Sequence, residues 1–362
     1  MPLLPATDEN IETAAAVLAA GGLVAFPTET VYGLGGDAFN PRSLAKIFEV
    51  KNRPRFDPLI IHIALPGALE EAADLSLLSG EVREKVRLLI SRFWPGPLTL
   101  ILPKNPKLPG LATSGLSTAA VRLPDHPAAQ KLIRLSGTAV AAPSANPFGY
   151  LSPTRAEHVA GLLGDRIDLI LDGGPCRVGL ESTVLDMSGA LPRLLRPGGV
   201  PLAEIEALIG PASAPAGPSA GAPPNPRSPG QLGSHYAPRT GLTVLSPAEM
   251  AVLPYDPAGA YLFFDPSSRD QWLAGPGRKA VPDGGKIGAL LDAGTEKNRE
   301  FRVRILSETG DLTQAAANLF DILHEMDDLG LSRIYAEQVR EEGLGPAIND
   351  RLFRAAEKKQ AP

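Results

Sequence analysis

Residues 210–230 constrain the fold of this chain more than any other stretch. They contain seven prolines, four glycines, five alanines and three serines, and Arg227 is the only charged residue among them. Proline lacks the backbone N–H that helices and inner strands use, and so little apolar surface cannot drive folding. We therefore expect a semi-stiff linker over residues 210–241, between a domain at 1–209 and a smaller one at 242–357.

The composition indicates a globular protein and narrows its partners. Of the 362 residues, 44% are hydrophobic and 21% are charged, which is enough to bury an ordinary core. Forty acidic against 35 basic residues give a formal charge of −5, so any contact with RNA would have to be local. The single cysteine, Cys176, excludes an intramolecular disulfide and fits a cytoplasmic protein. We expect no membrane segment, because no apolar run approaches about 18 residues.

Alternating strand and helix patterns predict an α/β or α+β domain with a twisted mixed sheet in the first 209 residues. Strands are expected at 23–26, 59–63, 98–102, 117–123, 138–142, 182–187 and 191–195. Helices are expected at 9–20, from Asn40-Pro41 onward, at 81–92, at 126–135, and from Ser152-Pro153-Thr154 onward. The alternation in 117–123 puts Thr118 and Arg122 on one face of their strand, so both can point into the same pocket.

Strand and helix patterns alternate again after the linker, which predicts a small Rossmann-like α/β layer. Strands are expected at 242–245, 260–264 and 333–337, and helices at 247–252, 268–274, 312–327 and 346–357. The long helix has Asp311 as its cap and an apolar stripe that includes Leu319 and Leu323. Neither a G-x-G-x-x-G nor a Walker sequence occurs in this region, so its residues alone do not indicate its role.

The stretch from Pro27 to His62 concentrates polar and basic side chains around two strand ends. The apolar run 23–26 leads into a predicted polar turn with Thr28, Glu29, Thr30, Gly33, Gly35 and Gly36. Five basic residues follow, against the single acid Glu49: Arg42, Lys46, Lys51, Arg53 and Arg55. A cluster of basic residues is most often only a solvent-exposed part of the protein surface. Here prolines flank Arg55 and a predicted buried strand follows directly. This arrangement favours a phosphate-binding loop in which each guanidinium group binds two phosphate oxygens in a bidentate manner.

Several motifs in order resemble the threonylcarbamoyl-AMP synthase family, which has a YrdC-like fold. They are PTETVYGLGGDAF, KNRPRFDPLIIH, FWPGPLTL, the pair Lys51-x-Arg53 with Ser144-x-Asn146, GLESTVLD at 179–186, and SPGQLGSHYAPRTGL. The resemblance covers residues 1–245 densely and fits the longer, two-domain form. It implies an L-threonylcarbamoyladenylate synthase, a nucleotidyltransferase that joins L-threonine, bicarbonate or CO2, and ATP, and releases pyrophosphate. The adenylate would serve a separate transferase that makes N6-threonylcarbamoyladenosine next to the anticodon of tRNA.

The resemblance also implies which residues form the site. Its catalytic residues would be Lys51, Arg53, Ser144 and Asn146, with ATP bound by these four and by Asp57, Thr118, Ser152, Arg196 and Tyr236. Threonine would be bound by Thr30, His62, Arg122, Ala142 through its backbone, and Ser182, with Arg122 on the carboxylate. Residues 231–239 of the linker would close over the nucleotide. Magnesium is expected on the phosphates, and its protein ligands are not identified.

Some of these residues have ordinary alternative roles. Ser144 and Asn146 are common turn residues, and a lone histidine such as His62 is more often a hydrogen-bonded core residue. The position of Asp57 is commonly Asn in the family, so this carboxylate is doubtful as a nucleotide ligand and could be a magnesium neighbour instead. Cys176 next to Arg177 is best read as a small buried residue, since no base is placed beside it.

Two other functions share the fold. One is a non-enzymatic protein that grips double-stranded RNA on a basic concave surface, and the other is the carbamoyl transferase domain of hydrogenase maturation. An RNA platform has no need of an amino-acid pocket built from Thr30, His62 and Arg122. The second activity is accompanied by zinc-finger and acylphosphatase-like segments that this sequence lacks. The synthase is therefore the predicted function.

Overall fold

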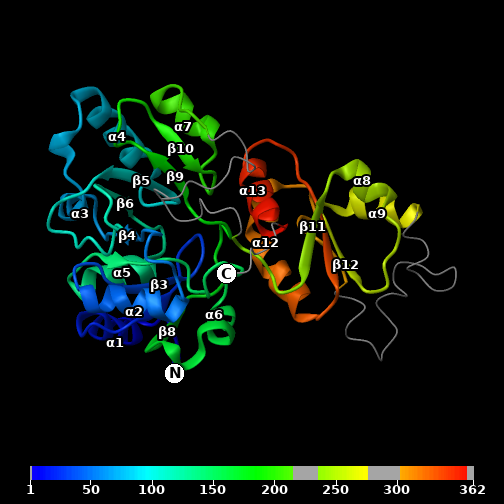
Figure 1. Ribbon diagram of the computed structural model, residues 1–362, viewed down its shortest axis with the longest axis horizontal. Coiled ribbons are helices and arrows are strands. Elements are labelled where there is room, and N and C mark those ends of the chain that lie inside the picture. The colour runs from blue at the N-terminus through cyan, green and yellow to red at the C-terminus, as the bar shows by residue number, and fades with distance from the viewer. Residues whose placement is uncertain (1, 215–234, 276–301, 357–362) are drawn as a thin grey trace. The chain divides into compact units, whose positions relative to one another are not determined.

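The computed structural model describes residues 2–214, 235–275 and 302–356 (Figure 1). The chain divides into two compact units, Met1–Phe148 with Ser152–Gly233, and Gly149–Leu151 with Ser234–Pro362. Most of the expected linker, including residues 231–234 of the segment expected over the nucleotide, lies outside the described residues.

The larger unit contains a ten-stranded mixed sheet in the order β1-β8-β2-β3-β7-β4-β6-β5-β9-β10. The strands are β1 (Leu3–Pro5), β2 (Val24–Phe26), β3 (Gly33–Asp37), β4 (Ile60–His62), β5 (Leu98–Pro103), β6 (Thr118–Arg122), β7 (Val140–Ala141), β8 (Leu169–Asp172), β9 (Thr183–Asp186) and β10 (Arg193–Arg196). Strands β4 and β6 pair in parallel, as do β5 and β9, whereas β5 and β6 are antiparallel. The predicted YrdC-like mixed sheet is confirmed.

Seven α-helices are described in this unit, and several of them begin directly after a capping side chain. They are α1 (Asp8–Ala19), α2 (Pro41–Lys51), α3 (Leu69–Ala72), α4 (Gly80–Phe93), α5 (Pro127–Ser136), α6 (Ala156–Leu163) and α7 (Leu202–Ile209), with single-turn 3-10 helices at Pro66–Ala68, Leu75–Leu77 and Gly164–Arg166. The side chain of Thr7 accepts a hydrogen bond from the Asn10 N–H, and that of Asn40 accepts one from Arg42. At the other end of α2, Asn52 takes a left-handed conformation with φ of 51° and stops the helix at Lys51.

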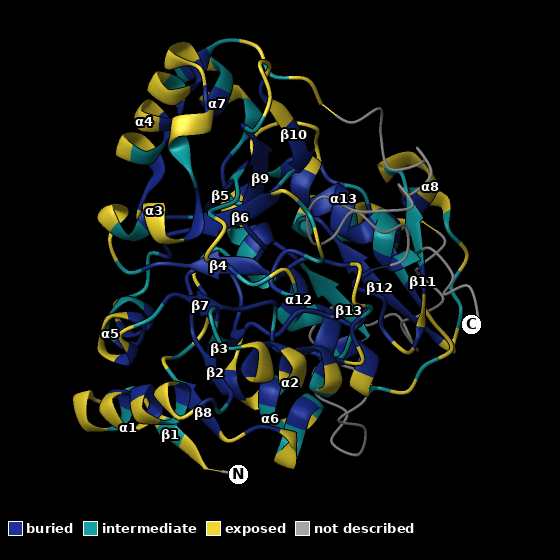
Figure 2. Cartoon of the chain, turned by 60° about the vertical axis from the view of Figure 1, so that its left-hand side comes forward, coloured by how far each residue is buried: buried dark blue, intermediate teal, exposed yellow. Residues whose placement is uncertain are grey.

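The helices cover the two faces of the sheet unequally. On one face, α2, α4, α6 and α7 pack on the strands in a single large apolar core. On the other face, α1 and α5 pack over β2, β7 and β8. The remaining strands on that second face share a small cluster, and within the described residues it contains strand side chains alone: Ile60, Ile101, Ala120, Val184 and Leu195. Figure 2 shows these strands in the dark blue of buried residues, while the outer sides of α1 and α4 are exposed. His62, Thr118 and Arg122 project from this half of the sheet face.

Three local predictions are corrected by the sheet. Residues 33–37 form the strand β3 rather than part of a turn, because they pair antiparallel with β2 and β7. Gly35 allows the close packing there, since a Cβ would lie 2.8 Å from the Phe26 ring and 2.9 Å from Val140. Strands β1 and β8, which the sequence pattern did not indicate, pair in parallel with each other, and β8 also pairs with β2. The helix expected from Ser152 begins at Ala156.

The smaller unit confirms the expected Rossmann-like layer. The four strands among its described residues are all parallel, in the order β11-β14-β12-β13. They are β11 (Gly241–Leu245), β12 (Gly259–Phe263), β13 (Val303–Ile305) and β14 (Arg333–Glu337), and the helices are α8 (Pro247–Val252), α9 (Pro266–Ala274), α12 (Leu312–Asp328) and α13 (Gly345–Ala356). The predicted cap Asp311 and the apolar stripe of α12 are both present, and β13 is the strand that the sequence pattern missed. No described helix is long and apolar enough to cross a membrane.

Candidate active site

The sheet register brings two of the expected site residues side by side. His62 ends β4 and Arg122 ends β6, and the two are paired positions in the parallel ladder. Their side chains therefore project from the same face, as does that of Thr118, four residues before Arg122. This is the face on which no described helix joins the apolar cluster of β4, β6, β5, β9 and β10.

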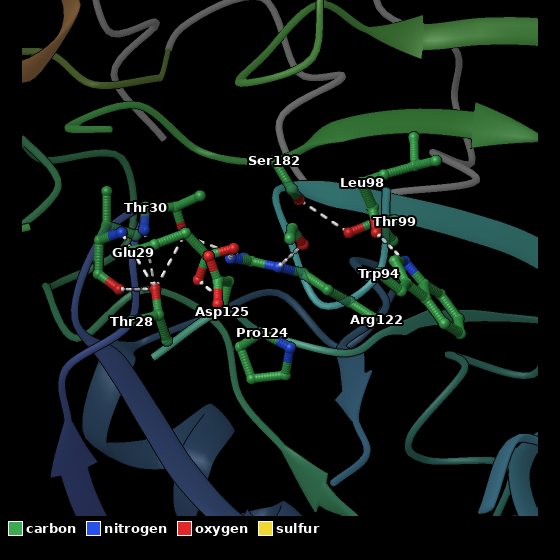
Figure 3. A network of polar contacts seen from close by, with 12 residues as sticks. Thr28, Glu29, Thr30, Trp94, Leu98, Thr99, Arg122, Pro124, Asp125 and Ser182 are labelled. Carbon is green, nitrogen blue, oxygen red and sulfur yellow. Dashed lines mark hydrogen bonds and ion pairs between the residues drawn. The ribbon is translucent and has the colours of Figure 1, made fainter. Parts of the chain in front are cut away.

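Arg122 is held from three sides (Figure 3). Its Nη2 lies 2.6 Å from the carboxylate of Glu29, in an ion pair whose side chains are 4% and 0% exposed. Its Nη1 donates to Thr30 Oγ1 at 2.9 Å, and its Nε donates to the carbonyl of Gly96 at 3.2 Å. The guanidinium is thus fixed in orientation, and its charge is balanced by a neighbouring carboxylate.

The turn before β3 forms a directed chain of hydroxyl groups. Thr28 Oγ1 donates to the carbonyl of Val31 at 2.6 Å, so the 2.8 Å contact between the two threonine hydroxyls has Thr30 as its donor. Thr30 in turn accepts from Arg122, as above. With its own proton engaged, the Thr30 hydroxyl can offer a ligand only a lone pair.

Glu29 is the residue of this network to which the sequence analysis assigned no role. Besides its ion pair with Arg122, its Oε2 accepts a hydrogen bond from the backbone N–H of Asp125 at 3.0 Å. Its own carbonyl accepts from Val178 at 2.8 Å. The one local signal was its position directly before Thr30 in the polar turn. That position does not predict the ion pair, because Arg122 lies on a strand 93 positions later in the chain.

His62 is a neutral imidazole in this environment. Burial lowers its pKa to about 3, and the positive charge of Arg122 acts in the same direction. Its Nδ1 lies 3.3 Å from the carbonyl of Ile60, and its ring meets Phe26 edge-on with 6.3 Å between centroids. His62 therefore combines the features of a core histidine with a position beside Arg122.

Ser182 and Arg196 meet at the beginning of β9 and the end of β10. Ser182 Oγ lies 2.7 Å from Thr99 Oγ1, and Arg196 donates to the Ser182 carbonyl from Nε at 3.1 Å and from Nη2 at 2.9 Å. Gly198 allows this approach, because a Cβ there would lie 2.4 Å from the carbonyl oxygen of Glu181. Ser182, which is predicted to bind threonine, and Arg196, which is predicted to bind ATP, are thus in direct contact.

Lys51, the last residue of α2, is linked by hydrogen bonds to the loop after β7. Its Nζ donates to the carbonyl of Ser144 at 2.6 Å and to the carbonyl of Asn146, and lies 3.5 Å from Asn146 Oδ1. Burial lowers the pKa of Lys51 well below its ordinary value, and the charge of Arg53 lowers it further. The Lys-x-Arg and Ser-x-Asn motifs are therefore brought together through lysine contacts with backbone and amide oxygens.

Arg53 and Asp57, in the segment that follows α2, form a buried ion pair. Arg53 Nη2 lies 2.8 Å from Asp57 Oδ2, while its Nε and Nη2 donate to the carbonyls of Asp57 and Pro58 at 3.0 and 2.8 Å. Burial raises the pKa of Asp57, and the charges of Arg53, Lys51 and Arg196 act against that rise. By contrast, Arg42, Lys46 and Arg55 are exposed, so the basic cluster consists of a solvated part and a buried part.

The remaining expected residues have different surroundings. The Ala142 N–H donates to the carbonyl of Ile60 at 2.9 Å, Thr118 is buried at the start of β6, and Ser152 Oγ donates to Glu181. Tyr236 belongs to the smaller unit, where it has φ of 63° and packs on Phe320 of α12 with 5.6 Å between ring centroids. Cys176 is buried as expected, and burial raises its pKa.

The fold defines the class of this protein as a two-unit α/β protein whose larger unit is a YrdC-like domain. A family model described as "Telomere recombination" matches residues 16–198, and one described as "Threonylcarbamoyl-AMP synthase, C-terminal domain" matches residues 200–357. The chain belongs to the threonylcarbamoyl-AMP synthase family and is therefore an enzyme.

Relatives of known name are similar over nearly the whole chain. The threonylcarbamoyl-AMP synthase of Pyrococcus abyssi (strain GE5 / Orsay) is 41% identical over 347 residues, 96% of this chain and 94% of that protein. That of Bacillus subtilis (strain 168) is 42% identical over 357 residues, 98% of this chain and 94% of the relative. A crystal structure of P. abyssi Sua5 complexed with L-threonine has a TM-score of 0.78 and 38% identity, and covers 97% of this chain and 95% of that one. These findings favour the synthase over the RNA-binding and carbamoyl-transferase alternatives.

Proposed function

We propose that this enzyme joins L-threonine, bicarbonate or CO2, and ATP into threonylcarbamoyl-AMP, with release of pyrophosphate. The observation that carries the proposal is the presence in one unit of two buried cationic clusters with different partners. Arg122 is held by the carboxylate of Glu29, the hydroxyl of Thr30 and the carbonyl of Gly96, whereas Lys51 and Arg53 are held mainly by carbonyl oxygens. The first suits the head group of an amino acid, and the second suits a polyanion. The similar P. abyssi protein in complex with L-threonine supports the first assignment.

At the amino-acid end, Arg122 would bind the threonine carboxylate. Thr30 would accept a hydrogen bond from the substrate, because its own proton is directed to Thr28. His62 stays neutral beside Arg122 and would contact the substrate without adding charge. Ser182 and the backbone at Ala142 complete the proposed set.

At the nucleotide end, Lys51 and Arg53 would bind the triphosphate. A phosphate oxygen would replace the weakest lysine contact, the one to Asn146 Oδ1 at 3.5 Å, and so release the Asn146 amide for the nucleotide as well. Ser144 would face the same phosphates. Further contacts with the nucleotide are proposed for Thr118, Ser152, Arg196 and Tyr236.

The reaction needs no covalent bond to the enzyme. Carboxylation of the threonine amine gives a carbamate, with release of a proton when CO2 reacts and of water when bicarbonate reacts. A carbamate oxygen then attacks the α-phosphorus in line while pyrophosphate leaves. The work of the protein is then to position two substrates and to balance negative charge, for which a site rich in Lys, Arg and hydroxyls is suited.

We propose that magnesium enters on the triphosphate, because Mg²⁺ commonly keeps phosphate oxygens and water as ligands. Among the described residues, no group of three or more His, Cys, Asp or Glu side chains could hold a metal ion. Asp57 is the carboxylate next to Lys51 and Arg53, and it is already paired with Arg53. These residues therefore do not make up a metal site by themselves.

The remaining parts of the proposal concern the surroundings of the reaction. The catalytic domain would end near residue 209, and the linker 210–241 would close over the nucleotide and bring Tyr236 to it. The product would pass to a tRNA threonylcarbamoyl transferase. A cytoplasmic location fits the use of ATP and tRNA and the free thiol of Cys176.

Pyrophosphate release tests the function directly. The enzyme with Mg-ATP and bicarbonate should release pyrophosphate when L-threonine is added, and omission of any one substrate should abolish the release. Calorimetry with threonine and ATP, separately and together, then tests whether both bind. Activity with another amino acid and none with threonine would contradict the proposal.

A further inference from the structure

We infer that Glu29 is the counter-ion that makes the Arg122 site select a zwitterionic amino acid over a simple carboxylate anion. Glu29 acts through Arg122 and is therefore a positioning and specificity residue. The inference rests on the proposed function, because it takes the Arg122 site as the place of the amino acid.

The first support is the burial of both charges. The Glu29 and Arg122 side chains are 0% and 4% exposed and lie 2.6 Å apart, so water can screen neither charge. An isolated buried guanidinium would be costly and would attract any small anion that reached it. The carboxylate of Glu29 removes most of that attraction before a substrate arrives.

The second support is that Glu29 is itself fixed in place. Its second carboxylate oxygen accepts from the Asp125 N–H at 3.0 Å, and its carbonyl accepts from Val178 at 2.8 Å. Figure 3 places Glu29 between Thr28 and Thr30 on one side and Arg122 on the other, with Asp125 adjoining. Because backbone groups hold it, Glu29 cannot swing away when a carboxylate approaches Arg122.

A ligand at this site therefore meets a positive and a negative charge together. The carboxylate of a free amino acid would face Arg122 while its ammonium group offsets the repulsion from Glu29. An anion that lacks the ammonium group would meet that repulsion uncompensated. Coulomb interactions are strong where water is excluded, so this difference should dominate the choice between ligands that are otherwise alike.

The test compares two ligands with the same carbon skeleton. L-threonine and (R)-3-hydroxybutanoate share the carboxylate and the β-hydroxyl, and differ in the α-ammonium group. Calorimetry should give the wild-type enzyme a strong preference for threonine. In Glu29→Gln the side chain keeps its size and can still accept from Asp125, and we expect the preference to fall by tenfold or more, partly through tighter binding of the anion.

A matched control removes a neighbouring charge without touching Arg122. The Asp125 side chain pairs with Arg177 at the surface, and Asp125 contacts Glu29 only through its backbone N–H. Asp125→Asn should therefore keep the wild-type preference. The variant Glu29→Asp keeps the charge and should also keep the preference, even if threonine binds more weakly. If the Gln variant does not fold, loss of the preference in Glu29→Asp would still overturn the inference.

The outcomes separate the two proposals. An unchanged preference in Glu29→Gln, or a preference lost equally in Glu29→Asp, would overturn the counter-ion role alone. A wild-type enzyme that binds the anion as tightly as threonine would also overturn it. A wild-type enzyme that binds neither ligand would contradict the proposed function, and the inference would fall with it.

Discussion

The ammonium group of Lys51 donates a hydrogen bond to the backbone carbonyl of Ser144 at 2.6 Å, across 93 positions of the chain. One partner closes helix α2 and the other lies in the loop that follows β7. The contact assembles two sequence motifs into one cationic cluster. It also means that Lys51 is oriented by main-chain oxygens before a nucleotide arrives, which is the preorganisation that charge stabilisation needs.

Replacement of Lys51 by methionine tests this cluster. Methionine has nearly the same length without the charge, so we expect Lys51→Met to lower threonine-dependent pyrophosphate release by about 10²- to 10³-fold in a protein that still folds. Lys46→Met is the matched control on the same helix, because Lys46 donates to the Gly21 carbonyl at 2.9 Å instead. Similar losses in both variants would indicate a defect of the helix rather than of the site.

Replacement of Asp57 by asparagine tests the departure from the family pattern. The Arg53 guanidinium stays anchored on the carbonyls of Asp57 and Pro58, so loss of the carboxylate should remove a repulsion without moving Arg53. We expect Asp57→Asn to lower the KM for ATP by about threefold or more, and to leave the KM for threonine unchanged. A raised KM for ATP that excess Mg²⁺ restores would instead make Asp57 a magnesium neighbour.

The lowered pKa of His62 predicts how acid affects stability. The native state leaves His62 unprotonated down to about pH 3, whereas the unfolded chain takes up a proton below about pH 6.5. This group therefore costs no stability above pH 6.5 and costs progressively more as the pH falls. Between pH 7.5 and pH 5 the loss should be about 2 kcal/mol.

Denaturant unfolding of the wild type and of His62→Gln at these two pH values measures that loss. Whatever its stability at pH 7.5, the variant should lose about 2 kcal/mol less on acidification than the wild type does. Equal losses in the two proteins would mean that His62 is accessible to protons in the native state.

Gly198 should be as important to activity as the side chains around it. A methyl group there would lie 2.4 Å from the main chain of residues 181–183, so Gly198→Ala must displace Ser182 and the Arg196 that binds it. We expect a loss of activity of about 10²-fold, since a shift of about 1 Å can cost that much. Gly189→Ala is the control, because a Cβ at Gly189 has no neighbour within 4 Å. Equal activity of the two variants would contradict this role.

The family motifs and local patterns were sufficient to predict much of the fold. Residues 8–19, 41–51 and 312–328 are helices whose caps, first-turn prolines and apolar stripes are short-range features. The strands with long apolar runs were predicted for the same reason. Strands β1 and β8 were missed because each is defined by its parallel partners rather than by its own pattern.

The sequence by itself determined the two-unit division of elements, the motif that holds Lys51 and Arg53, and the sharing of one strand face by Thr118 and Arg122, because each follows from local spacing. Only the tertiary structure decided that Glu29 is the ion-pair partner of Arg122 and that Arg196 meets Ser182. It also decided that Gly33–Asp37 is a strand, through antiparallel pairing with β2 and β7. These outcomes depend on the register of strands distant in sequence, and no local pattern encodes which side chains that register places together.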